Sequence, residues 1–401
     1  MGENTNLKKF DPEYYISGNS LIADYQGHIS ICGNDITFSF LEFDAKVKIN
    51  TYCLVLSKDT NDILDQEINS LKGTNEDGSP YHVNFETLNY TFSGCAFNDS
   101  VNFNPLENST VTVDYCTFKE GFYINNGYLN DDKIIKVNTI TIEDSTFEND
   151  FAVYKAEINT IKINNVDFES LSEFNEVTFQ DKFDFKEITY KGLTLFDKCI
   201  FNTKAEFEYI IFEKFTSFRG STFNKGLNLD YTSGDKEINF FGINGLESDE
   251  SKLETSRETY RIIKNCFENI GNKIEANTYL TLELERHRKD TWNLFFKEDV
   301  FSHPGLTLKL LLDGVVSFFH WLSSNHSSNW LLALFWIFIV SFVTNVWLGH
   351  ALNINCIFKY INVLSSIDDF DDSYIALVLN KVSLGYLYYQ FLTAVRKDTR
   401  K

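Results

Sequence analysis

Polar side chains recur along one side of the last apolar segment of the chain. Asn380, Ser383, Leu387 and Gln390 are separated by three, four and three positions, so they share one face of a helix. Polar groups are costly in hydrocarbon and should face protein or water. Several copies of this helix around one axis would enclose water, so the spacing predicts that these four residues line a pore. The alternative is a polar seam inside a passive bundle of helices.

Acidic side chains come just before this segment. In the stretch SSIDDFDDSY the acids are Asp368, Asp369, Asp371 and Asp372. A ring of such carboxylates, contributed by several subunits, would concentrate cations at the outer mouth of a pore. Two alternatives stay open. One is a calcium site, although the glycine and terminal glutamate of an EF-hand loop are absent, and the other is a plain solvated loop. No TVGYG-like sequence indicates potassium selectivity.

Two long apolar segments are expected to hold these residues in a membrane. Residues 330–348 carry no charged side chain, and a helix of that length matches a hydrocarbon core of roughly 30 Å. A buried helix of a soluble domain is the alternative, but no neighbouring region is large enough to enclose it. A second span is predicted at about 374–395, and both spans belong to a membrane module over 328–401.

Charge gives the expected orientation of this module. Basic residues flank it at 286–297 (Arg286, Arg288, Lys289, Lys297) and at the end of the chain (Arg396, Lys397, Arg400, Lys401), whereas residues 349–373 carry one lysine and four aspartates. The positive-inside rule therefore places both termini in the cytoplasm of a multi-pass membrane protein. Residues 304–324 are apolar but contain Lys309, Asp313 and His320, which predicts an amphipathic helix on the inner leaflet. A third span is the alternative and would move the C-terminus outside.

The soluble part of the chain is acidic. The 401 residues carry a net charge of -21, and because the part from Arg286 onward is slightly positive, residues 1–285 carry about -23. Such a surface repels phosphate backbones, so we do not expect binding to duplex DNA. The N-terminus has no apolar signal segment, which favours a cytoplasmic location for residues 1–285. The seven cysteines and seven histidines are scattered, so no metal site and no cofactor is expected.

Large aromatic residues recur every eleven positions in the first half of the chain. One series is Phe174, Phe185, Phe196, Phe207 and Phe218, and a second series lies five positions further along: Phe168, Phe179, Tyr190, Phe201, Phe212 and Phe223. Two positions before each member of the second series stands a small or branched residue. Short strands at a fixed spacing, with polar residues between them, predict a coiled β-solenoid with internal aromatic stacks. The region over 83–245 resembles pentapeptide-repeat and right-handed β-helix sequences, which implies a right-handed coil. Residues 1–82 are β-rich and are expected to form a cap or the first rungs.

The composition changes after the repeats. A helical hairpin is predicted over 250–297, because Tyr260, Ile263 and Phe267 follow a helical period and Gly271 ends the run. The fold class is therefore a mainly β solenoid, followed by an α-helical hairpin and an α-helical two-span membrane module. The carboxylates of the solenoid fall at turn and solvent positions and no nucleophile motif is present, so we do not expect an enzyme.

This arrangement resembles bacterial pentapeptide-repeat proteins that end in a two-helix ion-channel module. The resemblance rests on the aromatic repeats, the pair TYRIIKNCFENIGNKIEANTY and the final LGYLYYQFLTAVRKDTRK. It is similar in plan to the membrane effector of the Hailong anti-phage defence system. It implies a bacterial inner-membrane location, a sensing solenoid and control by a nucleotide or short single-stranded DNA. For such a ligand we assign six basic candidates: Lys214, Arg219, Lys225, Arg257, Arg261 and Lys264.

Two functions follow from these observations. The first is a gated channel, which with two spans per chain requires a homo-oligomer, most simply a tetramer. The second is a membrane-anchored scaffold, in which the solenoid recruits a partner and the helices serve only as a tether. A channel predicts ion flux that depends on Asn380 and Gln390, whereas a tether tolerates changes in the polar face.

Overall fold

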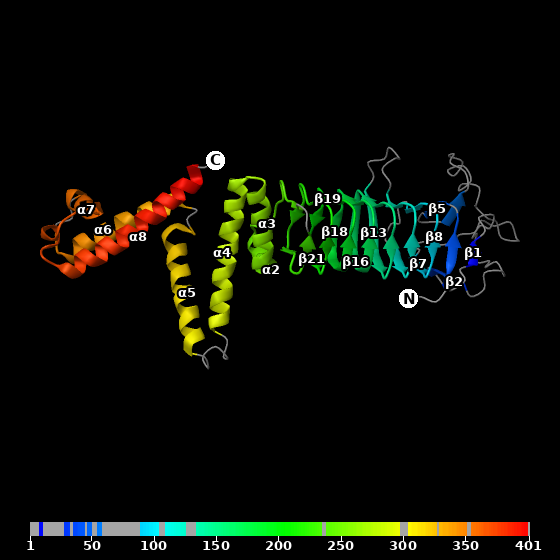
Figure 1. Cartoon of the computed structure of the whole chain (residues 1–401), viewed down its shortest axis with the longest axis horizontal. Coiled ribbons are helices and arrows are strands. Elements are labelled where there is room, and N and C mark those ends of the chain that lie inside the picture. The colour runs from blue at the N-terminus through cyan, green and yellow to red at the C-terminus, as the bar shows by residue number, and fades with distance from the viewer. Residues whose placement is uncertain are drawn as a thin grey trace, which may run out of the picture. The chain divides into compact units, whose positions relative to one another are not determined.

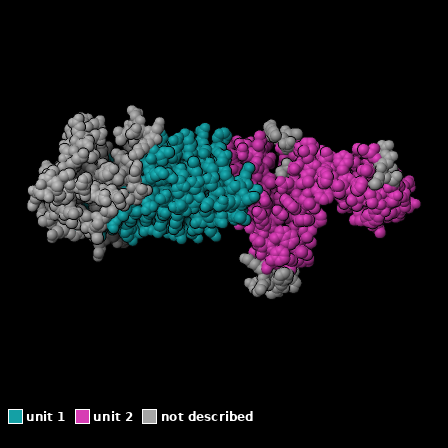
Figure 2. All heavy atoms as spheres, turned by 180° about the vertical axis from the view of Figure 1, so that it is seen from behind, with its two compact units in different colours: residues 1–256 teal, residues 257–401 magenta. Residues whose placement is uncertain are grey.

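The structure is a computed structural model of the full chain. It describes residues 8–10, 28–32, 35–44, 46–49, 54–57, 89–103, 109–125, 134–234, 238–296, 304–326, 329–350 and 354–399. Most of the predicted N-terminal region 1–82 lies outside these residues, as do Lys297, Arg400 and Lys401. The chain divides into two compact units, 1–256 and 257–401 (Figure 2).

The first unit is a β-solenoid, as predicted. Successive turns of the coil pair through parallel strands. Figure 1 shows β13 (Ile135–Glu143), β16 (Ala156–Phe168), β18 (Thr178–Tyr190) and β21 (Ala205–Glu208) side by side in that order. Among the described residues one sheet contains β5 (Lys46–Ile49), β6 (Leu54–Ser57), β9 (Val101–Phe103), β12 (Phe122–Ile124), β15 (Phe151–Tyr154), β17 (Ser172–Asn175), β19 (Thr194–Asp197), β23 (Thr216–Ser217) and β27 (Ile238–Asn239).

The second sheet holds the remaining described strands. They are β1 (Lys8–Phe10), β2 (Ile29–Cys32), β3 (Asp35–Ser39), β4 (Leu41–Phe43), β7 (Asn89–Ser93), β8 (Ala96–Phe97), β10 (Thr110–Asp114), β11 (Thr117–Phe118), β13 (Ile135–Glu143), β14 (Thr146–Phe147), β16 (Ala156–Phe168), β18 (Thr178–Tyr190), β20 (Ile200–Phe201), β21 (Ala205–Glu208), β22 (Ile211–Phe212), β24 (Thr222–Phe223), β25 (Leu227–Asn228) and β26 (Ser233–Gly234). Strands β3, β4 and β5 pair in parallel with β7, β8 and β9, so they occupy the place of a first rung.

One turn of the coil spans two of the eleven-residue units. Thr194 of β19 pairs with Thr216 of β23, 22 positions later. Strands β20, β21 and β22 lie between them, so each turn here has four short sides. Each eleven-residue series therefore separates into two columns on different sides of the interior. Phe174 stacks on Phe196, two units along, with ring centroids 4.8 Å apart.

The interior of the solenoid is filled by these aromatic columns. Phe196 is fully buried and continues the stack to Phe218 at 5.2 Å, and Phe179, Phe201 and Phe223 form another column. Burying a phenylalanine contributes roughly 2–3 kcal/mol, and the stacked geometry adds to this. The thiol of Cys199 lies in the same interior, where burial raises its pKa, so the thiol stays protonated.

A left-handed residue marks a corner of the coil in every eleven-residue unit. Asn165, Glu176, Glu187, Lys198 and Tyr209 all have φ between 53° and 56°. Each lies directly before an inward-pointing residue such as Ile188 or Cys199. The left-handed conformation costs a non-glycine residue roughly 1–2 kcal/mol, so the ladder hydrogen bonds on both sides must hold it.

The helices begin at the end of the first unit. Helix α2 (Asp249–Glu254) belongs to that unit, and the second unit contains α3 (Arg257–Asn269), α4 (Lys273–Phe295), α5 (Pro304–Ser324), α6 (Trp330–Trp347), α7 (Ile354–Ile361), the 3₁₀ turn η3 (Ile367–Phe370) and α8 (Tyr374–Thr399). Gly271 has φ of 78° in the turn between α3 and α4, which pack as a hairpin. Gly314 of α5 lies against Trp292 of α4, where an added Cβ would come within 3.3 Å of the indole.

Helix α6 matches the first predicted span. Among the described helices it alone is long and apolar enough to cross a membrane, judged by length and composition. Helix α8 covers the second predicted span as one continuous helix of 26 residues. Its Asn380, Lys381 and Gln390 make it less apolar than α6, so the two-span module remains a prediction.

Candidate functional site

The face of α8 that carries the predicted pore residues packs against the same chain. The side chain of Asn380 is buried, and its Nδ2 donates to Oγ1 of Thr344 on α6 at 3.0 Å. It also donates to the backbone oxygen of Tyr360 on α7 at 3.4 Å. Asn380 therefore ties α8 to both neighbouring helices. The sequence alone did not single out Thr344 or Tyr360, because their roles depend on the pairing of helices.

Gln390 lies at the other end of this face. Its Oε1 accepts a hydrogen bond from Oγ of Ser324, at the C-terminus of α5, at 3.0 Å, and both side chains are buried. One turn earlier, the hydroxyl of Tyr386 lies 3.2 Å from Oγ of Ser323. The end of α5 is therefore attached to α8 by two polar contacts.

An apolar layer separates the two polar ends. Ile337 of α6 packs against Leu384 and Leu387 of α8, and all three are buried. Leu387, a predicted pore residue, belongs to this layer, and Ser383 is half-buried. In the single chain the predicted stripe thus forms a closed seam between helices. A pore would require these side chains to leave their present partners, so pore lining remains a prediction.

The four aspartates of the predicted outer mouth have different surroundings. Oδ1 of Asp369 lies 3.1 Å from Nζ of Lys359 on α7. Oδ2 of Asp371 lies 2.7 Å from Nε2 of His350. Asp368 and Asp372 are exposed. Two of the four acids are therefore paired with nearby basic side chains. The spacing of the acids in the sequence did not predict these pairs.

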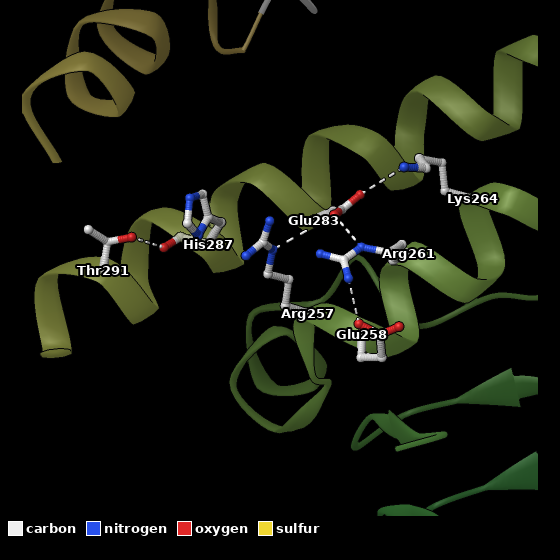
Figure 3. A network of polar contacts seen from close by, with 7 residues as sticks. All are labelled: Arg257, Glu258, Arg261, Lys264, Glu283, His287 and Thr291. Carbon is white, nitrogen blue, oxygen red and sulfur yellow. Dashed lines mark hydrogen bonds and ion pairs between the residues drawn. The ribbon is translucent and has the colours of Figure 1, made fainter. Parts of the chain in front are cut away.

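Three of the six predicted ligand cations converge on one carboxylate. Arg257, Arg261 and Lys264 lie on one face of α3 and surround Glu283 of α4 (Figure 3). The distances to the Glu283 oxygens are 3.7 Å from Nε of Arg257, 3.1 Å from Nε of Arg261 and 3.1 Å from Nζ of Lys264. Glu283 is 6% exposed, so the cluster joins the two helices around a nearly buried charge.

Further groups modify the charge of this cluster. Arg261 also donates to Oε2 of Glu258 at 2.8 Å. His287 lies on α4 one turn after Glu283, and burial together with the Arg257 guanidinium lowers the pKa of its imidazole (Figure 3). With His287 neutral, the three cations outnumber the two carboxylates by one. A ligand phosphate would have to compete with Glu283 for them.

The other three predicted cations lie on the solenoid and have separate neighbours. Arg219 stacks over the ring of Phe241 at 5.7 Å, and Nζ of Lys225 lies 4.0 Å from Glu250 of α2. Lys214 is exposed. Within the first unit they do not meet at one point, so a shared ligand site with α3 remains a prediction.

No family model, curated protein or solved structure matches this chain. The solenoid is therefore established by the strand pairing itself. The relationship to channel-bearing pentapeptide-repeat proteins and the link to anti-phage defence remain predictions from the residues.

Proposed function

We propose that this protein is a membrane-anchored β-solenoid, in which α6 and α8 form a helical hairpin in the bilayer and the solenoid binds a macromolecular partner. The observation that carries the proposal is the sidedness of the hairpin. The buried polar groups have protein partners, Asn380 with Thr344 and Gln390 with Ser324 of α5, while the exposed side chains are almost all apolar. A helical pair with that distribution is suited to hydrocarbon, because polar side chains there must be satisfied within the protein.

The outward faces of the hairpin are large and apolar. On α6 the exposed residues include Phe335, Phe338, Phe342, Val343 and Val346. On α8 they include Ile375, Val378, Leu379, Val382 and Leu392. A contiguous apolar surface of this kind marks a membrane or protein contact. The uncharged composition of α6 favours the membrane.

Helix α5 extends this apolar surface. Leu308, Leu312, Val316 and Phe319 are each more than half exposed and fall at steps of four, four and three. On the other side of α5, the guanidinium of Arg288 on α4 lies over the ring of Trp321 at 4.5 Å, and this contact holds α5 to the α3–α4 hairpin. We assign α5 to the surface of the inner leaflet, as its mixed composition predicts.

The solenoid supplies the partner-binding part of the proposal. Tyr209 and Tyr231 stack at 5.2 Å with exposed fractions of 52% and 73%, and Ile211 is also exposed. Exposed tyrosines on a rigid scaffold provide contact area at low entropic cost. The partner class that fits is a protein with an apolar surface.

A second candidate function is a gated oligomeric channel, for which the resemblance implies control by a nucleotide signal. The observation that favours it is the continuous seam along α8. In this scheme the present arrangement is a closed state, sealed by Ile337, Leu384 and Leu387. Opening would turn Asn380 and Gln390 toward water between identical copies.

Extraction and flux measurements separate these functions. The anchor proposal predicts that the full chain stays with membranes in alkaline carbonate and gives no ion flux when reconstituted in liposomes. Flux that is altered by Gln390→Ala would favour the channel. Release of the chain by carbonate would contradict both functions.

A further inference from the structure

Helix α7 does not lie beyond the ends of α6 and α8 but folds back along them. The rings of Phe358 and of Phe338 on α6 meet edge to face, with their centroids 6.1 Å apart. Ile361, the last residue of α7, packs on the apolar layer that contains Ile337 and Leu387. Figure 1 shows α7 beside these two helices.

The depth of α7 follows from helix geometry. Ile337 lies ten residues before Trp347, the end of α6, which corresponds to about 15 Å at 1.5 Å per residue. The 18 residues of α6 span about 27 Å, close to the thickness of a hydrocarbon core. If α6 crosses the bilayer, its whole length is needed to span the hydrocarbon, so its outer half cannot project into water. Ile361 must then lie within the hydrocarbon, below the end of α6.

The backbone carbonyl groups at the end of α7 are hydrogen-bonded within the protein, as a location in hydrocarbon requires. Three successive carbonyl oxygens accept hydrogen bonds from α8: that of Tyr360 from Asn380, that of Ile361 from the Tyr388 hydroxyl at 3.0 Å and that of Asn362 from Nζ of Lys381 at 2.9 Å. The last carbonyls of a helix otherwise lack partners, and a cation there also complements the helix dipole. The polar residues of α8 thus cap a second helix.

The turn after α7 is closed in the same way. The backbone N–H of Leu364 donates to Oδ1 of Asn362 at 2.9 Å, and the N–H of Ser365 donates to the backbone oxygen of Asn362 at 3.3 Å. The N–H of Ser366 donates to Oδ2 of Asp369 at 2.9 Å. The side chain of Leu364 in this turn is 90% exposed. A turn with internally satisfied N–H groups and an exposed leucine suits hydrocarbon rather than water.

The acidic residues lie at a different depth. Phe370 packs against Ala376, near the outer end of α8, and its ring lies 5.2 Å from that of Tyr360 of α7, so α7 and the 3₁₀ turn η3 both contact this end of α8. Asp371 lies beside His350, beyond the end of α6, whereas the turn that carries Leu364 is bound by Lys381, two turns into α8. Two charged groups face this segment: Lys381 is bound to the turn and stacks over Phe370 at 5.2 Å, and Lys359 of α7 is paired with Asp369 at 3.1 Å.

We propose that residues 354–370 form a re-entrant segment that inserts into the half of the bilayer nearer the α6–α8 connection, with Ile354, Phe358 and Leu364 against lipid acyl chains. This inference rests on the proposed membrane hairpin. The apolar exposed face of α7 is continuous with that of α6 through Phe338, which is why acyl chains are the occupant it fits.

The test places a genetically encoded nitroxide amino acid at position 358 or 364 of the full chain in phosphatidylcholine liposomes. Controls carry it at position 342, on the outer face of α6, and at position 209, on the solenoid. Accessibility to oxygen, which partitions into lipid, is compared with accessibility to a water-soluble nickel chelate. We expect positions 358 and 364 to resemble 342, with an oxygen-to-nickel ratio several-fold above that of position 209.

Each other outcome overturns the inference in a distinguishable way. If 342 is lipid-exposed while 358 and 364 resemble 209, the segment lies in water and the hairpin survives. If 358 and 364 are shielded from both reagents, protein covers them instead of lipid. If 342 itself resembles 209, the membrane hairpin fails as well. A label at position 354 provides a second test if a label at position 364 prevents folding.

Discussion

The side-chain amide of Asn380 donates a hydrogen bond to the hydroxyl of Thr344 at 3.0 Å, and this contact joins α8 to α6 within the apolar part of the second unit. A residue whose spacing suggested contact with water thus has a protein partner. The same holds for Gln390, which accepts from Ser324. The polar groups of α8 fix the packing of neighbouring helices in the single chain.

The Asn380–Thr344 contact can be measured by a double-mutant cycle. Asn380→Ala and Thr344→Val should each destabilise the hairpin, and the double variant should lose less than the sum. We expect a coupling of about 0.6–1 kcal/mol, the usual size for such pairs between membrane helices. Unfolding of the full chain in mixed micelles gives the four free energies. Strict additivity would show that the pair does not interact.

The aromatic columns should dominate the stability of the solenoid. Phe196→Ala leaves a cavity between Phe174 and Phe218, so we expect a loss of about 3–5 kcal/mol. The matched control is Leu193→Ala, three positions away and 49% exposed, with an effect below about 0.5 kcal/mol. Thermal unfolding and limited proteolysis of the full chain report both effects. Equal losses in the two variants would contradict the internal stacks.

The carboxylate of Glu283 should hold α3 against α4. Glu283→Gln leaves Arg257, Arg261 and Lys264 facing one another, and we expect a loss of about 2 kcal/mol, reduced from the value for fully buried pairs because both arginines are partly exposed. The control is Glu258→Gln, which removes one exposed pair. Hydrogen exchange in 257–295 measures the loosening.

The same variant tests the predicted anionic ligand. Because Glu283 competes for the three cations, Glu283→Gln should bind a short single-stranded DNA or a nucleotide more tightly than the unmodified chain does. Weaker binding in Glu283→Gln would show that the cluster serves another purpose.

The junction between α5 and α6 should loosen in acid. Burial, reinforced by the nearby His320, Arg288 and Lys397, lowers the pKa of His326 to about 4. The unfolded junction takes up a proton below pH 6.5 while the folded one does not, so stability falls as the pH drops from about 6.5 towards 4 and levels off below that. The hydrogen-exchange protection factors of residues 320–330, corrected for the intrinsic pH dependence of exchange, should fall over this range and lose most of that dependence in His326→Asn. If the pH dependence of protection is the same in His326→Asn as in the unmodified chain, His326 is not the group that loosens the junction.

The aromatic spacing was sufficient to predict the solenoid, because an inward side chain must repeat once per side of the coil. It was not sufficient to give the turn length. Phe174 and Phe185 are equivalent in sequence, and only the strand pairing shows that Phe174 stacks on Phe196. The left-handed corners were missed because Asn165, Glu176 and Lys198 share no residue type.

The polar face of α8 shows a different limit. Periodicity correctly placed Asn380, Leu387 and Gln390 on one face, since that follows from the helix alone. What covers the face depends on α5, α6 and α7, whose packing no local pattern encodes. Lys359 and His350 likewise lie far from the acids in sequence, and only the fold brings them into contact with Asp369 and Asp371.

The most direct test of the anchored hairpin is the water accessibility of its polar face in a bilayer. Cysteine is placed at position 380 or 390 of the full chain in liposomes, and its reaction with a small charged thiol reagent is followed by peptide mass analysis, with position 384 as the buried reference. We predict that 380 and 390 react as slowly as 384. Rapid reaction at both, with 384 protected, would place the seam in a water-filled pore and contradict the anchor.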